Sequence, residues 1–378
     1  MKPYDSIVIG LGGVGSAALY HLAQRGGRVL GLDRFPPGHD RGSSHGETRI
    51  IRQAYFEHPD YVPLACQAYS LWDELSSECG RTLRRETGLL QVGPPDGHVI
   101  RGVIESAARH ALVVDELTPA EITRGFPGFV VPEGLCGVLE RVAGYLRVED
   151  CVLAHLEQAN QRGAQVLSGI EVRRWRPDGG GYVVETSGES YAAGHLIVTA
   201  GAWASDLLAE LGVPLEVRRK PMFWFENPSP AYREDRGSPA FLYDLPDGVF
   251  YGFPDPGDGT VKIAEHSGGE VVADPLAVDR GMRPADRNRL SGFLSGHLPG
   301  VGRRVVRHSV CMYTMTPDEH FVVDVHPDHP RVAFAAGLSG HGFKFAGVLG
   351  KALVELALDG KTAIPVGFLA WRRFAARL

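Results

Sequence analysis

The stretch DSIVIGLGGVG, residues 5–15, decides the first part of the fold. Its apolar residues predict a buried strand, its glycines a tight turn, and the run that follows an amphipathic helix. Gly10, Gly12 and Gly15 fit the pattern G-x-G-x-x-G. In that pattern the first glycine permits the turn, the second lets a pyrophosphate approach the backbone, and the third lets helix and strand pack closely. The unpaired N–H groups at the helix start would face the phosphates.

An acidic residue at the end of the next apolar segment supports this interpretation. Asp33 ends the segment VLGLD and follows Gly12 at about the 20-residue spacing of an acid that binds the ribose hydroxyls. Strand, glycine turn, helix, strand and acid therefore occur in the order of a dinucleotide-binding unit, and an ordinary glycine turn is the weaker alternative. The spacing does not say which dinucleotide is bound.

Length and composition predict a two-domain globular protein without a nucleic-acid-binding or membrane-binding surface. The chain has 378 residues and a formal net charge of −6, with 44% hydrophobic residues. No apolar run approaches the roughly 18 residues that a membrane span requires. Five scattered cysteines without a C-x-x-C pair favour reduced thiols in the cytoplasm. The final tripeptide Ala-Arg-Leu, residues 376–378, leaves a peroxisomal address as the alternative.

Periodicity predicts an α/β chain in which a doubly wound domain is interrupted by a second domain. Helices are expected at residues 61–79, 103–111, 148–162, 200–211 and 346–358. A second strand, turn and helix of the nucleotide-binding type returns near residue 196, after a long insertion. The nucleotide-binding domain would comprise residues 1–80, 146–214 and 315–378. Residues 81–145 and 215–314 would form a substrate domain whose short strands build a mostly antiparallel sheet.

Several chemically capable side chains have competing interpretations. If residues 47–52 are helical, Arg49 and Arg52 share a face and could bind an anion together, whereas a solvated basic face is the plainer interpretation. Period two places Lys262 and His266 on one face of a strand at residues 260–266. Cys311 and Tyr313 share a face of another strand.

Each of these strand residues also has an ordinary interpretation. Lys262 would be solvated, His266 would be a core histidine and Cys311 a small buried hydrophobe. His326 and His329 lack a third ligand at a suitable spacing, so no metal site is expected.

Four motifs together carry a family resemblance. They are GSSHGETRIIR at residues 42–52, YGFP at 251–254, VCMYT at 310–314 and GHGFKF at 340–345. The chain resembles the monomeric sarcosine oxidase and N-methyltryptophan oxidase family along essentially its whole length. The resemblance implies a Rossmann-type FAD-binding domain, a monomer, and oxidation of a secondary amino acid such as sarcosine by dioxygen. The products would be the demethylated amino acid, formaldehyde and hydrogen peroxide.

The resemblance also implies roles for individual residues. Cys311 would carry the FAD covalently, Arg52 and Lys344 would bind the substrate carboxylate, and Lys262 would assist reduction of dioxygen. Catalytic residues on the substrate side would be His266, Tyr251 and Tyr313, with Arg49 as the basic residue next to the flavin. The remaining FAD contacts implied are Gly10, Gly12, Gly15, Asp33, Ser43, Val172, Gly340, Gly342 and Phe343.

Two departures from the family pattern concern the substrate. Ser44 stands where a histidine is frequent, and residues 241–245, near the family's gating side chains, are not closely matched. A larger N-methyl amino acid and a cyclic imino acid such as pipecolate or proline therefore stay open. A nicotinamide-dependent dehydrogenase and a non-catalytic flavin-binding module are the alternatives from other classes.

Overall fold

The glycine-rich stretch lies at the centre of an eight-stranded sheet in the computed structural model, which describes residues 3–375. β1 (Tyr4–Ile9) pairs in parallel with β2 (Val29–Asp33) on one side and with β12 (Ser190–Val198) on the other. The parallel part is extended by β9 (Gln165–Ser168) and β20 (His329–Ala336), and the antiparallel part by β10 (Val172–Asp178), β11 (Gly181–Thr186) and β19 (Val322–His326). The predicted α/β fold with a discontinuous sheet is confirmed.

Helices cover this sheet and bury its apolar face. α1 (Gly13–Arg25) packs between α5 (Val148–Gln161) and α8 (Ala346–Asp359), and α2 (Val62–Cys79) packs against α8. The cluster they share with the sheet includes Leu19, Trp72 and Leu349, all at most 1% exposed. Such buried apolar surface is the main source of stability for these layers. α2 ends as its sequence predicts, because Gly80 adopts the left-handed conformation of a helix C-cap.

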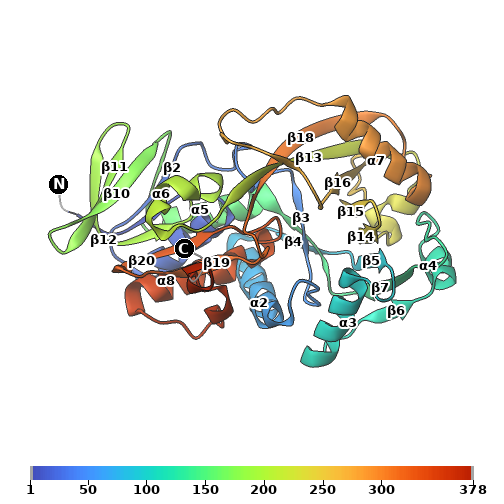
Figure 1. Ribbon diagram of the computed structural model, residues 1–378, viewed down its shortest axis with the longest axis horizontal. Coiled ribbons are helices and arrows are strands. Elements are labelled where there is room, and N and C mark those ends of the chain that lie inside the picture. Colours follow the sequence, from blue (N-terminus) through green and yellow to red (C-terminus); the bar gives the residue numbers. More distant parts are fainter. Residues whose placement is uncertain (1–2, 376–378) are drawn as a thin grey trace.

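A nine-stranded sheet occupies the other half of the molecule (Figure 1). All its adjacent strands are antiparallel except one parallel pair, β5 with β14. α3 (His98–His110) packs on one face and α7 (Pro284–His297) on the other. The strands are β5 (Leu89–Gly93), β6 (Asp115–Leu117), β7 (Cys136–Glu140), β13 (Glu216–Glu226), β14 (Ala240–Leu245), β15 (Gly248–Phe253), β16 (Thr260–Glu265), β17 (Glu270–Val271) and β18 (Val305–Met315).

A small third sheet corrects the interpretation of residues 47–52. They contain a strand, β3 (Thr48–Ile51), which pairs with β8 (Gly144–Arg147), and β8 also pairs with β4 (Arg84–Glu86). The β-branched residues of β3 favour this extended form. Neither earlier interpretation of the two arginines holds: they do not share a helix face, and both are buried, with exposures of 9% for Arg49 and 3% for Arg52.

The predicted helix at residues 200–211 is also wrong. The segment forms three short pieces, η2 (Gly201–Trp203), α6 (Ala204–Leu207) and η3 (Ala209–Leu211). Leu208, between the last two, has φ −125° and ψ 25°, which interrupts the helical backbone. The helix α7 was not predicted, since its apolar residues, including Leu290, Phe293 and Leu294, lie within a polar and glycine-containing segment.

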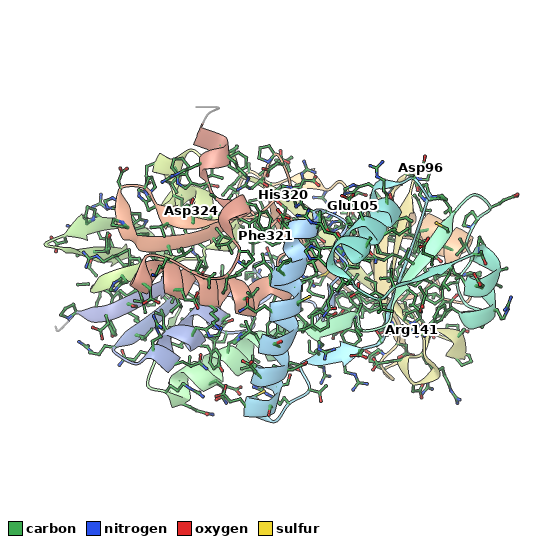
Figure 2. All side chains as sticks on the ribbon, turned by 90° about the horizontal axis from the view of Figure 1, so that it is seen from below. Asp96, Glu105, Arg141, His320, Phe321 and Asp324 are labelled. Carbon is green, nitrogen blue, oxygen red and sulfur yellow. The ribbon has the colours of Figure 1, made fainter. Side chains whose placement is uncertain are left out.

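The connection from β18 to β19 reaches the start of α2. His320 and Phe321 lie beside one end of that helix (Figure 2). The Tyr61 hydroxyl is 3.2 Å from His320 Nδ1 and accepts a hydrogen bond from the Phe321 N–H at 3.3 Å. This contact joins the loop at residues 316–321 to the helical layer.

Membrane-spanning helices and metal-ligand clusters are both absent from residues 3–375. None of the helices there is both long and apolar enough to cross a membrane. The same residues contain no group of three or more His, Cys, Asp or Glu side chains that could hold a metal ion. The tripeptide at residues 376–378 lies outside the described residues.

Candidate functional site

Two adjacent cavities lie where the sequence motifs converge. The larger extends from the Gly10–Gly13 turn past Asp33 and Val172 to Phe343. The smaller shares four of its lining residues, Arg49, Tyr313, Gly340 and Phe343. The expected cofactor residues Gly10, Gly12, Asp33, Ser43, Val172, Gly340, Gly342 and Phe343 line the larger cavity. The smaller is lined by the expected substrate residues Arg52, Tyr251, His266, Tyr313 and Lys344.

The nucleotide end of the larger cavity fits the adenosine and pyrophosphate of FAD. Asp33 Oδ2 accepts a hydrogen bond from the Leu11 N–H at 2.7 Å, and its Oδ1 accepts one from the Phe35 N–H at 2.8 Å. These bonds hold the carboxylate at the end of β2, beside the glycine turn, as a ribose-binding acid requires. Trp203 also lines this cavity, and its buried Nε1 has no hydrogen-bond partner among residues 3–375. An indole N–H in that state suits a polar ligand group.

Two glycines of the turn, Gly10 and Gly15, leave no room for side chains. A Cβ atom at Gly15 would lie 1.8 Å from the Gly10 carbonyl oxygen, so the helix can approach the strand only with glycine there. Gly15 therefore packs the unit together and does not itself line the cavity. Gly10 has φ +89°, a left-handed conformation that glycine adopts without strain.

Gly15→Ala is expected to abolish retention of FAD, because the added methyl group must push α1 away from β1 and so open the pyrophosphate turn. The visible absorbance of the purified protein measures the FAD content. Gly188→Ala is the matched control, since no atom lies within 4 Å of a Cβ built at Gly188. A yellow Gly15→Ala protein with wild-type FAD content would contradict the role of this turn.

Cys311 lies against Arg49, which lines both cavities. The thiol is 1% exposed, and Arg49 Nη2 lies 3.2 Å from its Sγ. The same Nη2 donates to the Ser43 carbonyl at 3.0 Å, and Ser43 Oγ donates to the Met312 carbonyl at 2.6 Å. These bonds tie the loop of the first motif onto β18. A fixed positive charge therefore lies next to the sulfur atom expected to carry the flavin.

Lys262 is buried and fully hydrogen-bonded. Its Nζ donates to the carbonyls of Gly46, at 2.5 Å, and Thr48, at 2.9 Å, and to Thr48 Oγ1 at 3.1 Å. Burial and the neighbouring Arg49 lower the pKa of Lys262 well below its usual range. Lys262 and Cys311 are not among the residues that line either cavity, so of the four side chains singled out on the two strands only His266 and Tyr313 line the smaller one.

The aromatic side of the smaller cavity presents neutral polar groups. His266 Nδ1 is 3.4 Å from the Tyr313 hydroxyl, and Tyr251 lines the cavity beside them. Burial and nearby Lys220 lower the pKa of His266 to about 3, so this ring is neutral near pH 7. The sequence did not reveal Lys220, whose Nζ donates to the carbonyls of His266, Ser267 and Gly268 and fixes that turn.

The opposite side of the smaller cavity is cationic. Lys344 Nζ donates to the His341 carbonyl at 2.8 Å and to the Tyr55 hydroxyl at 3.2 Å. The Arg52 guanidinium lies over the rings of Tyr55 and Phe56, at 4.3 and 4.1 Å. The buried Arg52 Nε has no hydrogen-bond partner in the described part of the chain. Both cations line the cavity and so can meet one anionic ligand.

Glu57 is the site residue that sequence reasoning missed. Both of its carboxylate oxygens accept from Arg52 Nη2, at 2.6 and 2.5 Å. Burial alone would raise its pKa, but Arg52 lowers the pKa of Glu57 to about 2, so the carboxylate is ionised. Among the ionisable residues that line this cavity, Arg49 and Arg52 are cationic and Glu57 is anionic, while burial and Arg52 lower the pKa of Lys344 well below its usual range. The excess of positive charge suits a ligand that carries a carboxylate.

The two departures from the family pattern both reach the cavities. Ser44 Oγ accepts a hydrogen bond from the Gly13 N–H at 2.9 Å, at the start of α1, and Ser44 lines the larger cavity. Leu242, from the poorly matched segment, lines the smaller cavity beside Ile50 and Phe56. This apolar wall is where a substrate side chain would meet the protein.

Comparisons with known proteins agree with this geometry. A family model described as FAD dependent oxidoreductase matches residues 5–356. The monomeric sarcosine oxidase of Bacillus sp. (strain B-0618) is 40% identical over 379 residues, which cover 99% of this chain and 97% of that protein. The N-methyl-L-tryptophan oxidase of Yersinia pestis (strain Pestoides F) is 38% identical over 375 residues, covering 98% and 99%.

A solved structure supports the same placement. NikD, described as an unusual amino acid oxidase essential for nikkomycin biosynthesis, matches with a TM-score of 0.86 and 28% identity. The match covers 98% of each chain. Sequence and fold thus agree over the full length, and the chain belongs to the monomeric sarcosine oxidase and N-methyltryptophan oxidase family of FAD-dependent oxidoreductases.

Proposed function

We propose that this protein is an FAD-dependent oxidase of a secondary amino acid, with sarcosine as the main candidate substrate. The observation that carries the proposal is that Arg52 and Lys344 both line the smaller cavity, which shares a wall with the larger cavity. Sarcosine, dioxygen and water would give glycine, formaldehyde and hydrogen peroxide. When bound, FAD supplies the two-electron acceptor that this reaction requires.

The side chains of the smaller cavity would bind and orient the substrate. A guanidinium and an ammonium fix a carboxylate in one place, which leaves the N-methyl carbon facing the shared wall at Tyr313 and Phe343. Neutral His266 and Tyr251 would contact the amine side without adding a second positive charge. Lys262 would stabilise the negative charge that develops on dioxygen as it is reduced.

The apolar wall of Leu242, Ile50 and Phe56 bears on substrate size. A larger N-methyl amino acid or a cyclic imino acid is the alternative substrate. A peroxide-coupled screen of sarcosine, N-methyltryptophan, pipecolate and proline tests the proposal, and sarcosine is expected to give the highest kcat/KM. Absence of peroxide with every one of them would contradict the proposed function.

We further propose that the FAD is attached to Cys311. Acid precipitation of the wild-type protein is expected to leave the yellow colour in the pellet, because the thioether survives denaturation. The colour of Cys311→Ala should pass to the supernatant. Cys151→Ala, which removes another buried thiol far along the chain, is the control and should behave like wild type. Colour wholly in the wild-type supernatant would contradict the linkage.

The remaining features of the protein are proposed on the same basis. The FAD-binding domain would comprise residues 1–80, 146–214 and 315–378, and the substrate domain residues 81–145 and 215–314. Division of the strands between the two large sheets supports these boundaries. A monomer in the cytoplasm is proposed from the names of the sarcosine oxidase relatives and the scattered thiols.

A further inference from the structure

The turn that presents Lys344 is held from outside the cavity by a polar network. This turn, residues 337–345, lies between β20 and α8, and its Ser339 has φ 44°, an unusual left-handed value for a residue other than glycine. Glu319, in the facing loop, has φ 58°. Two such residues in contacting loops indicate that the surrounding contacts impose the backbone shape.

His341 connects the turn to that facing loop. Its Nε2 is 3.0 Å from the Glu319 carbonyl and its Nδ1 is 2.6 Å from the Tyr55 hydroxyl. A carbonyl only accepts, so Nε2 carries the hydrogen and Nδ1 accepts from Tyr55. Burial lowers the pKa of His341 to about 4, which keeps the ring neutral at pH 7. With its proton directed to His341, the Tyr55 oxygen presents a lone pair to Lys344 Nζ.

The facing loop, residues 316–320, is closed by its own side chains and by Ser339. Thr316 Oγ1 donates to the His320 carbonyl at 2.7 Å. The Thr316 N–H donates to Ser339 Oγ at 3.2 Å, and Ser339 Oγ donates to the Gly337 carbonyl at 3.1 Å. Loop and turn are therefore joined through Ser339 as well as through His341.

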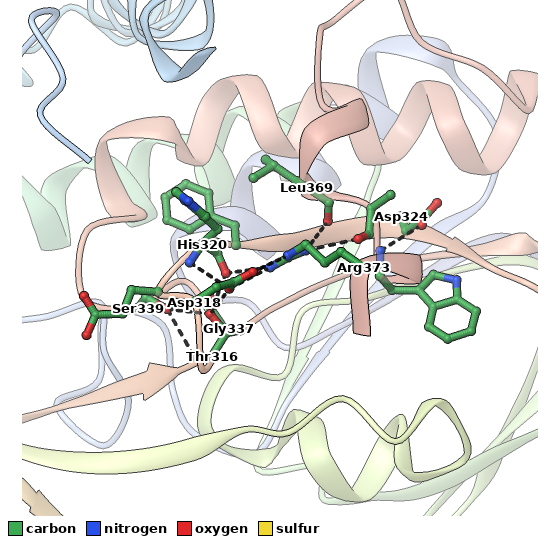
Figure 3. Close-up of polar contacts among 12 residues, drawn as sticks. Thr316, Asp318, His320, Asp324, Gly337, Ser339, Leu369 and Arg373 are labelled. Carbon is green, nitrogen blue, oxygen red and sulfur yellow. Dashed lines mark hydrogen bonds and ion pairs between the residues drawn. The ribbon is translucent and has the colours of Figure 1, made fainter. Parts of the chain in front are cut away.

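Arg373 closes the network from α9 (Arg372–Ala375), as Figure 3 shows. Its Nε donates to Asp318 Oδ2 at 2.7 Å, while its Nη2 donates to the His320 carbonyl at 2.9 Å and to Asp318 Oδ1 at 3.3 Å. The pair is partly screened from water, with side-chain exposures of 20% for Arg373 and 32% for Asp318. A two-point contact of this kind fixes orientation as well as distance.

We propose that Asp318 and Arg373 are positioning residues for the substrate-binding turn. By holding residues 316–320 they keep the Glu319 carbonyl on His341, and His341 in turn sets the direction of Tyr55 and Lys344. Neither residue lines the larger or the smaller cavity, so both would act through the turn. The consequence for substrate binding rests on the proposed function, since it takes Lys344 to bind the carboxylate.

The test measures the FAD-loaded Asp318→Asn protein by two independent methods. Amide hydrogen exchange across residues 337–345 is expected to be about tenfold faster than in wild type, because the loop loses its charged contact with Arg373. The KM for sarcosine is expected to rise about 5- to 20-fold while kcat changes less than about twofold, as for loss of one positioned contact. Arg373→Lys keeps the charge but cannot make the two-point contact with Asp318. It should show faster exchange and a higher KM as well, with smaller changes.

Asp73→Asn is the matched control, since the Asp73 side chain, which is 55% exposed on α2, makes the same kind of two-point pair with Arg84 through contacts of 3.0 Å. It should leave both measurements at wild-type values. The proposal is overturned if amide exchange at residues 337–345 is unchanged in both Asp318→Asn and Arg373→Lys. It is also overturned if exchange rises equally in Asp73→Asn. Hydrogen exchange needs no substrate, so a wild-type protein that oxidises nothing would refute the proposed function and leave this result standing.

Discussion

Lys262→Met is expected to slow reoxidation of the reduced enzyme by dioxygen by about two to three orders of magnitude, the usual loss on removing one preorganised charge-stabilising group. The amino group is held in place by three oxygen acceptors from residues 46 and 48, so it needs no rearrangement as negative charge develops on dioxygen. Burial and Arg49 lower its pKa, and the developing negative charge would favour its protonated form. Methionine keeps the length of the side chain and its packing against Trp224 and Phe253 while removing the charge.

Stopped-flow spectroscopy separates this effect from substrate oxidation. The enzyme is reduced by substrate without oxygen and then mixed with aerated buffer, and the return of the visible absorbance is timed. Lys220→Met is the matched control, because it removes another buried ammonium, from neighbouring strand β13, whose contacts lie on the His266 turn. Equal slowing of reduction and reoxidation in Lys262→Met would contradict the assigned role.

Arg52→Leu is expected to lower kcat/KM for sarcosine by roughly a thousandfold or more, since removing one partner of a buried charge pair costs about 2–5 kcal/mol and here the substrate contact is lost as well. The variant leaves Glu57 buried without the guanidinium that holds its pKa low, so that nearby Lys344 is left to favour its ionised form. That carboxylate would then repel the carboxylate of the substrate.

The double variant Arg52→Leu/Glu57→Gln isolates the repulsion. Removing the Glu57 charge should recover about tenfold of the lost kcat/KM, while Glu57→Gln alone should not reduce activity to the level of Arg52→Leu. Anaerobic reduction rates at several sarcosine concentrations supply the numbers. A double variant no more active than Arg52→Leu would show that charge in this cavity does not govern binding.

Local patterns were enough to predict the βαβ unit and the helices that pack on it. Its strand and helix periodicities, glycines and acid all lie within about thirty residues, so the prediction needed no knowledge of distant contacts. The strand at residues 48–51 could not be predicted in this way, because its partner β8 is almost a hundred residues away and supplies the ladder that makes it extended. The helix predicted for this segment was therefore wrong, and Arg49 and Arg52 are both buried instead of sharing a helix face.

The residues of the candidate site also divide into those that local patterns predict and those that only tertiary contacts bring together. The motifs located Arg52, Tyr313 and Lys344, and the period-two pattern at residues 260–266 singled out His266. All four do line one cavity. Glu57 could have been suspected from the need to balance buried arginine charge, but nothing local assigns it to Arg52. Lys220, Asp318 and Arg373 act on backbone carbonyls or on distant loops. Such contacts depend on tertiary arrangement, and no spacing in the sequence encodes them.

Reduction of the flavin by sarcosine and its reoxidation by dioxygen test the central claim most directly. Sarcosine added without oxygen is expected to bleach the visible absorbance of the wild-type protein. Admission of air should restore it, with one hydrogen peroxide and one formaldehyde formed per sarcosine consumed. Persistence of the yellow colour with sarcosine and with the other secondary amino acids, or a bleached protein that air does not reoxidise, would contradict the assignment as an amino acid oxidase.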